Sequence, residues 1–171
     1  MWNKMLTAIL TVTVIGAAAS AAGSEENEAS GAAVAKYLPG AKVTLQQGLS
    51  AAESQGKPIS GKFEVEEGHF QLSVYAAHDG KFSEVLVDPN TGKVAKTEAI
   101  TEGDDLADVK KQIEACGRSK KSLQSAVDKA EQASAGYRAI GVAPKLSGGH
   151  AVAVVTLLKG TQLKSLSEPL E

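Results

Sequence analysis

The stretch Leu45 to Glu53 reads Leu-Gln-Gln-Gly-Leu-Ser-Ala-Ala-Glu. A related stretch later in the chain, Leu123 to Glu131, reads Leu-Gln-Ser-Ala-Val-Asp-Lys-Ala-Glu. In both copies apolar residues recur at a spacing of four and then three, the period of one face of an α-helix. Each copy is followed by β-prone segments that close on an acid-proline pair, Asp88-Pro89 in the first and Glu168-Pro169 in the second. The chain therefore holds two copies of one helix-then-sheet unit.

In the first copy, the residues around the helix predict its ends and the strands that follow. Thr44 and Gln47 fit a capping box at the start of the helix, and Gly56 with Pro58 ends it. Asp79-Gly80 is a strong hairpin signal between alternating apolar and polar segments. We therefore expect an antiparallel meander of three or four strands over residues 59–66, 70–75 and 82–87, with a short extension through Val94.

In the second copy, Ser122 caps the helix and Gly136 ends it. A strand over residues 137–143 should stop at Pro144, and a last strand should cover residues 163–168. We match Lys159-Gly160 to Asp79-Gly80, so the offset in residue number between the copies rises from 78 at the helix to 80 at this hairpin. This change requires two extra residues in the second copy. It places Val152 and Val154 where Leu72 and Val74 lie in the first copy. A slip of one residue would reverse the buried face of this sheet. The copy ends before any counterpart of the turn 90–92, so we interpret it as truncated.

Between the copies, residues 104–117 predict a connecting helix. Asp104 or Asp105 can cap it, and its apolar stripe is Leu106, Val109, Ile113 and Cys116. The predicted fold is α+β, with units at residues 43–100 and 121–171 joined by a helical connector at residues 101–120. Because a unit of about 50 residues buries little surface alone, we expect the two units to pack as one rigid body.

Residues 1–22 have the three regions of a secretory signal peptide. A short basic start at Lys4 precedes an apolar segment from Met5 to Ala19, and small residues at 19–22 provide a cleavage site. An uncleaved anchor is the alternative, but the apolar segment is short for a bilayer. No Cys follows the small residues, so we expect no lipid-modified N-terminus. Residues 23–42 are interpreted as a flexible leader or a short helix over residues 32–38. The protein is therefore predicted to be periplasmic or secreted.

Composition excludes several classes of partner and of stabilising bond. The formal net charge is −2, from 18 basic and 20 acidic residues, so no basic excess drives binding to nucleic acid or to anionic lipid. The one cysteine, Cys116, cannot form an intramolecular disulfide. Stability must come from packing of Val, Leu, Ile and Ala.

The segment Glu84 to Val94 reads Glu-Val-Leu-Val-Asp-Pro-Asn-Thr-Gly-Lys-Val, a strand followed by an Asp-x-x-Thr-Gly turn and an apolar residue. Together with the preceding helix and hairpin, it resembles the PepSY domain of peptidase propeptides and YpeB-like proteins, well over residues 43–97 and more weakly over 121–171. The resemblance implies a tandem PepSY protein, exported, non-catalytic, and able to restrain or inhibit peptidases. No peptidase domain follows, so such inhibition would act in trans.

No motif for catalysis or for a cofactor occurs in the chain. His-Glu-x-x-His, Gly-x-Ser-x-Gly, the phosphate-binding loop and Cys-x-x-Cys are all missing, so we predict no enzyme, no catalytic residue and no cofactor. Three histidines lie in or beside expected turns, where solvated side chains are more common than metal ligands. They are His69, His78 and His150.

Three other features have a structural and a functional interpretation. Asp88-x-Asn90-x-Gly92 echoes a calcium loop but lacks its distal ligands, so we interpret it as a turn. Cys116 should be a small buried hydrophobe, with an intermolecular disulfide as the alternative. Glu64, Glu66 and Glu67 should be the solvated face of an exposed strand, with an acidic surface that repels or attracts a partner as the alternative.

The leading functional hypothesis is a module that binds a protein or peptide, such as a peptidase, along an exposed strand edge. The best candidate edge is the final strand at residues 163–168. The alternative is a periplasmic sensor or accessory protein that takes a small molecule or metal between the two units. A purely structural envelope protein is the third hypothesis.

Overall fold

A computed structural model describes residues 22–171 of the chain. The predicted signal peptide falls almost entirely on residues 1–21, outside the described residues, and stays a prediction. The helices are α1 (Ala22–Tyr37), the 3-10 turn η1 (Leu38–Gly40), α2 (Leu45–Ala52), α3 (Gly103–Arg118) and α4 (Leu123–Gln132). None of the helices within residues 22–171 has the length and apolar character needed to cross a bilayer.

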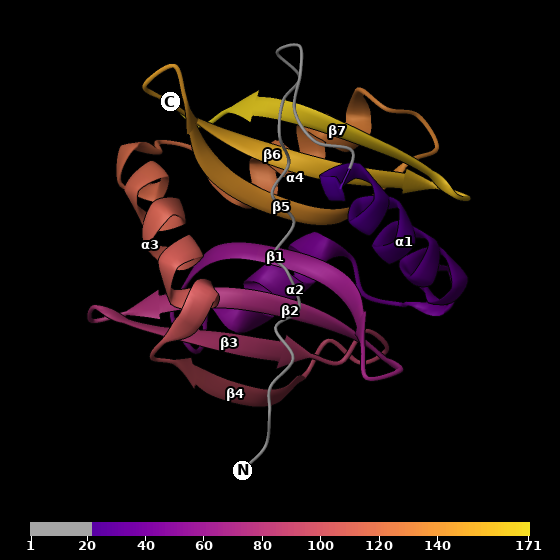
Figure 1. Cartoon of the computed structure of the whole chain (residues 1–171), viewed down its shortest axis with the longest axis horizontal. Coiled ribbons are helices and arrows are strands. Elements are labelled where there is room, and N and C mark those ends of the chain that lie inside the picture. The colour runs from indigo at the N-terminus through magenta and orange to yellow at the C-terminus, as the bar shows by residue number, and fades with distance from the viewer. Residues whose placement is uncertain (1–21) are drawn as a thin grey trace.

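The strands are β1 (Lys57–Glu66), β2 (His69–His78), β3 (Lys81–Val87), β4 (Val94–Ile100), β5 (Arg138–Ser147), β6 (His150–Lys159) and β7 (Gln162–Pro169). They form one antiparallel sheet in the order β4-β3-β2-β1-β5-β6-β7, as Figure 1 shows. The two meanders join where Gly61 pairs with Val142 and Lys62 with Gly141. The predicted α+β class is confirmed, and both units contribute to a single sheet.

The helices lie on both faces of this sheet. α2 and α4 contact each other and pack on one face, behind the sheet in Figure 1. Val109 of α3 packs with Tyr75, whereas Val74 and Ala76 on either side of Tyr75 pack in the cluster that contains α2. Because neighbouring strand residues point to opposite faces, α3 covers the other face. α1 and α3 lie at opposite ends of the β1–β5 junction (Figure 1).

A constant offset in residue number, 81, relates the strands of the two units. β1 and β2 correspond to β5 and β6 over their whole length. The shift in strand register between Pro58 and Ser60 also has its counterpart, between Ala139 and Gly141. α1 and α3 also differ by 81, but α2 and α4 differ by 78. The first unit has three more residues between its helices, and the second has three more between the start of α4 and β5. The expected drift to 80 was therefore wrong by one residue.

That one residue reverses a predicted face, as the register rule requires. Leu72 and Val74 correspond to Ala153 and Val155, which are fully buried with α2 and α4 in the same core. Val152 and Val154 lie on the opposite face. The assignment of these two valines to the main core was wrong.

The expectation that Pro144 stops the first strand of the second unit was also wrong. β5 continues to Ser147, and Pro144 pairs with Ala153 of β6. β5 pairs with β1 only at Gly141 and Val142. Among residues 22–171, Pro144 therefore lies where one side of β5 has no paired strand, a place that tolerates the missing N–H.

The segment before the first unit is a helix that starts well before Ala32. α1 ends at Tyr37, and its Val34 is buried in the main core together with Leu38 of η1. The short helix predicted over residues 32–38 is thus present over residues 32–37, as the last part of a longer helix. α3 begins at Gly103 after Glu102, which makes no side-chain capping bond, so neither Asp104 nor Asp105 is the cap.

Candidate functional site

The two ends of the sheet differ in what covers the third strand of each unit. β3 pairs with β2 on one side and with β4 on the other, from Phe82 opposite Ile100 to Val87 opposite Val94. β7 is the counterpart of β3 and pairs with β6. Among residues 22–171 no strand pairs with the outer side of β7. The place that β4 takes beside β3 is therefore open beside β7.

β7 is held firmly along its length and at its C-terminal end. Leu166 packs against the main core, and Lys164 Nζ donates to Ser134 Oγ at 2.9 Å. Leu170 is fully buried, and its carbonyl oxygen accepts hydrogen bonds from the backbone N–H groups of Lys120 and Lys121. The open edge is thus carried by an ordered strand.

The same anchor occurs in the first unit. The carbonyl oxygen of Pro89 accepts hydrogen bonds from the N–H groups of Lys42 and Val43, just before the N-terminus of α2. Pro89 is the counterpart of Leu170 at the offset of 81. Both units therefore tie the end of the third strand to the start of the helix.

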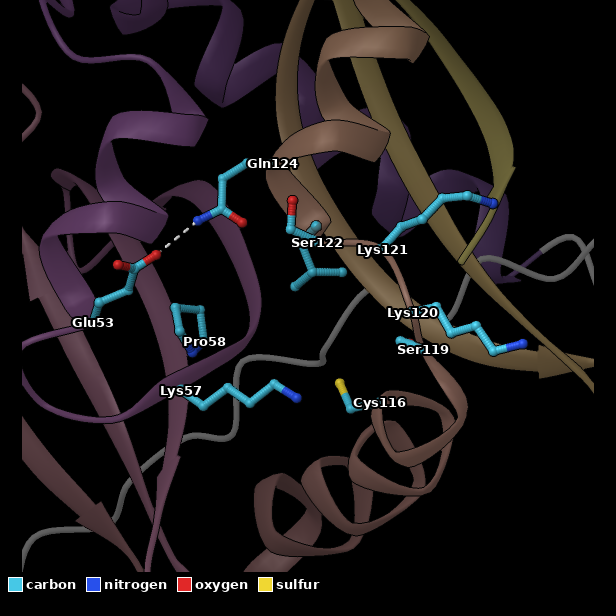
Figure 2. A pocket seen from close by; sticks show the side chains of 10 residues that line it. Glu53, Lys57, Pro58, Cys116, Ser119, Lys120, Lys121, Ser122 and Gln124 are labelled. Atoms are coloured by element: carbon cyan, nitrogen blue, oxygen red, sulfur yellow. Dashed lines mark hydrogen bonds between the residues drawn. The ribbon is translucent and has the colours of Figure 1, made fainter. Parts of the chain in front are cut away.

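A pocket of about 310 Å³ lies between the units, and Figure 2 shows its lining. Glu53, Lys57 and Pro58 come from the α2–β1 segment, and the remaining side chains come from the end of α3 and the start of α4. They are Cys116, Ser119, Lys120, Lys121, Ser122, Leu123 and Gln124. Nothing in the spacing of the sequence predicts that these two segments meet.

Within the pocket, the Lys57 ammonium group points toward the sulfur of Cys116 (Figure 2). Burial raises the pKa of the Cys116 thiol, and the positive charge of Lys57 opposes this shift. Gln124 Nε2 donates to Glu53 Oε1 at 3.0 Å, and Lys121 Nζ donates to the carbonyl oxygens of Pro169 and Glu171. The prediction that Cys116 is buried is confirmed, while its place in a pocket was not foreseen.

The acidic cluster of the first strand is not a solvated face. Glu64 is buried, accepts from Ser73 Oγ, and forms an ion pair with Lys62 at 2.6 Å. β1 is a central strand, so the expectation of an exposed strand was wrong for Glu64, although Glu67 in the turn is exposed. Burial, and then the negative charge of Glu64, raise the pKa of Glu84 on the same face.

The three histidines have separate local surroundings. His69 Nδ1 lies 3.2 Å from the carbonyl oxygen of Glu67, His78 Nε2 lies 3.3 Å from Asp79, and His150 Nδ1 lies 2.9 Å from Glu171. Within residues 22–171 no group of three or more His, Cys, Asp or Glu side chains is arranged to hold a metal ion.

The Asp88 segment is a turn, as expected. Asp88 Oδ1 accepts from the N–H groups of Asn90 and Thr91 at 2.8 and 2.9 Å, which holds the pKa of Asp88 below its usual range. Gly92 takes a φ of 71°, a conformation that glycine adopts without strain. The Asp88 carboxylate is thus used to shape the turn.

No protein-family model matches the chain, and no curated protein matches it in sequence. The fold is similar to the crystal structure of a putative lipoprotein from Clostridium difficile 630. The TM-score is 0.39 with 15% sequence identity, over 70% of this chain and 78% of that chain. A likeness of this degree assigns neither a family nor a function to the chain.

Proposed function

We propose that the protein is an exported, non-catalytic binding module that takes an extended segment of a protein or peptide along the outer edge of β7. The observation that carries this proposal is the inequality of the two units. β4 covers β3, and the equivalent side of β7 has no strand among residues 22–171.

An open strand edge binds an extended segment through its backbone. Alternate N–H and C=O groups of the edge strand pair with the incoming chain, and side-chain contacts on the two faces provide selectivity. The pairing of β3 with β4 gives the geometry of such a complex, an antiparallel segment opposite residues 163–168 of β7. Leu166 on the core-facing side and Ser165 on the other side would contact alternate side chains of the segment.

The proposed class of partner is a peptidase of the cell envelope. This choice rests on the resemblance of residues 84–94 to the PepSY turn and on the predicted signal peptide. No part is proposed for nucleic acid or for a membrane after signal cleavage.

The first test measures binding and inhibition. The protein without its signal peptide is incubated with a panel of envelope peptidases, and cleavage of a reporter substrate and co-elution are followed. We expect at least one peptidase to co-elute with the protein and to be slowed. The proposal fails if no peptidase in the panel binds or is inhibited.

The second test locates the bound segment by hydrogen exchange. In the free protein, every second amide of residues 163–168 should exchange fast, because strand amides alternate between the two sides. Binding should protect these amides and leave the outer amides of β4 unchanged, which makes β4 the matched control edge. Protection confined to β4 or to the helices would contradict the proposed edge.

A second candidate function is a ligand-binding accessory protein. The pocket between the units favours it, because it is lined by residues of both. His69, His78 and His150 do not line this pocket, so a metal held by them would not support this candidate. The candidate is tested by titrating the protein with small molecules and following Tm and the reactivity of Cys116, which lines the pocket.

A further inference from the structure

The pocket between the units lies beside the shorter of the two interhelical links. Residues 38–44 join α1 to α2 and include η1, whereas residues 119–122 join α3 to α4. The longer link is bound by Arg138, whose guanidinium donates to the carbonyl oxygens of Leu38, Ala41 and Val43 at 2.9, 3.2 and 2.7 Å. In the second unit, all four residues of the shorter link line the pocket.

Lys57 is the counterpart of Arg138 at the offset of 81. Arg138 is satisfied by three carbonyl oxygens, and its guanidinium lies over the ring of Phe63. Lys57 faces the pocket instead (Figure 2). Within residues 22–171 its ammonium group has no hydrogen-bond or ion-pair partner. A charge held at the mouth of a cavity without an anionic partner favours an anion there.

The other polar groups of the lining differ in what they offer to a ligand. Lys120 and Lys121 belong to the lining, but their ammonium groups point away from Lys57 and Cys116 (Figure 2), and Lys121 Nζ donates to the carbonyl oxygens of Pro169 and Glu171. Glu53, the one carboxylate of the lining, accepts a hydrogen bond from Gln124. The hydroxyl oxygen of Ser122 accepts from the N–H of Ser125, so its own proton can be donated to an oxygen atom of a ligand. The ammonium group of Lys57 and the hydroxyl group of Ser122 are therefore the donors with which this lining can hold an anion.

We propose that this pocket binds a small organic oxyanion, a molecule that carries a phosphate or carboxylate group, with Lys57 as its main charged contact. Its volume of about 310 Å³ is at the lower end of the range of small-molecule sites, roughly 300–1,000 Å³. Because it lies between α2–β1 and α3–α4, an occupant would contact both units. This site is separate from the β7 edge and does not depend on the proposed peptide binding.

The experiment uses inorganic phosphate and citrate as probes, each titrated against sodium chloride at the same ionic strength. Two readouts are followed, the Tm of the protein and the rate at which iodoacetamide alkylates Cys116. A ligand that binds the folded state raises Tm in a saturable manner, and an anion over Cys116 should slow alkylation over the same concentration range. A response to phosphate alone, to citrate alone or to both supports the proposal and distinguishes the chemistry of the natural group.

The matched variants are Lys57→Met and Lys42→Met. Both remove one exposed positive charge, and Lys42, the counterpart of Lys120 in the first unit, lies outside the pocket. Lys57→Met should weaken binding by about tenfold, the usual effect of losing one charge-assisted hydrogen bond, whereas Lys42→Met should bind like the wild type. Circular dichroism in chloride establishes that both variants fold.

Three results would overturn the proposal. The first is that neither anion changes Tm or alkylation beyond the effect of chloride. The second is that Lys42→Met weakens binding as much as Lys57→Met, which indicates general attraction of anions. The third is a rise in Tm without protection of Cys116, which places the anion elsewhere.

Discussion

The two units of this protein share one layout and fill it differently. Gly48 of α2 lies against Leu72 of β2, so closely that a Cβ at Gly48 would lie 2.0 Å from Leu72 Cδ2. The counterparts in the second unit are Ala126 of α4 and Ala153 of β6, both buried. The first unit combines a glycine on the helix with a leucine on the strand, whereas the second unit has an alanine at both places. The helix residue is thus larger by one methyl group in the second unit, and the strand residue is smaller.

The units also differ on the opposite face of the sheet. In the second unit, α3 packs mainly against β5 and β6. In the first unit the same face is divided. Ile59 and Tyr75 pack with Val109 of α3, and beside them Glu64, Ser73 and Gln71 form a hydrogen-bonded polar network. The comparison shows that α3 covers part of this face in both units and that the first unit adds a polar network beside the helix.

The largest expected effect on stability comes from the contact between Gly48 and Leu72. Leu72→Ala should reduce the free energy of unfolding by about 2–5 kcal/mol, because it leaves a cavity in a fully buried place. Adding Gly48→Ala to this variant converts the pair to that of the second unit. The double variant should recover about 1 kcal/mol from helix propensity and from partial filling of the cavity. Urea unfolding measures the free energy of unfolding of both variants. A double variant less stable than Leu72→Ala would show that the alanine pair of the second unit does not fit in the first.

The next effect compares Arg138 with Lys57. Arg138→Met removes three hydrogen bonds to backbone carbonyls and should cost about 2–4 kcal/mol, since unsatisfied half-buried acceptors are expensive. Lys57→Met at the equivalent place should change stability by less than about 0.5 kcal/mol. Chemical denaturation of the two variants in chloride buffer measures the difference. Equal losses of stability in the two variants would show that Arg138 holds its interhelical link no more strongly than Lys57 holds the other.

A smaller effect concerns the bonds between α2 and α4. Gln46 Nε2 donates to Glu131 Oε2 at 2.9 Å, and Gln124 Nε2 donates to Glu53 Oε1 at 3.0 Å, so the two bonds are related by the repeat. Glu131 also accepts from the N–H of Ala139, whereas the counterpart of Ala139 is Pro58, which has no N–H. Glu131→Ala should therefore cost about 1–3 kcal/mol and Glu53→Ala less than about 0.5 kcal/mol.

Denaturation of the two single variants tests this, and double-mutant cycles with Gln46→Ala and Gln124→Ala isolate each bond. A coupling energy for Gln124 and Glu53 that exceeds the one for Gln46 and Glu131 would contradict the expected order.

The smallest effect is a pH dependence confined to the first unit. The pKa of Glu84 is raised by burial and by Glu64, so the folded state binds a proton at Glu84 more tightly than the unfolded chain does. Its contribution to stability is full below the ordinary pKa of glutamate and is lost as the pH rises through the raised value. Glu84→Gln should therefore be more stable than the wild type at neutral pH in urea unfolding, with the difference vanishing in acid. Glu67→Gln, in an exposed turn, is the control.

The sequence predicted those features that depend on neighbouring residues. The two caps at Thr44 and Ser122, the two short helices they begin and the hairpin at Asp79-Gly80 are all present. The final strand was also correctly placed at an edge of the sheet. The caps, the short helices and the hairpin rest on hydrogen bonds or apolar spacings within a few residues, which a local pattern records, whereas the edge position of the final strand depends on long-range pairing.

The errors arose where long-range pairing decides. The buried face of β6 depends on a register that the sequence left uncertain by one residue. Glu64 looked like a surface residue, but pairing of β1 with β5 makes its strand central. The pocket could not be predicted from residue spacing, since its two sides are far apart in the chain. The one available signal was the difference in length between the two interhelical links.

By itself, the sequence determined that the chain repeats a helix-and-meander unit, where its short helices begin and which of their faces are apolar. Only the tertiary structure shows what the glutamine and glutamate shared by the two copies do. Gln46 bonds to Glu131, and Gln124 bonds to Glu53, so these side chains join α2 to α4. The tertiary structure also decided that β7 has an open edge and that Lys57 faces a pocket. The physical reason is range: capping and helical periodicity act between near neighbours in the chain, whereas strand register and contacts between the units join groups that belong to separate copies of the repeat.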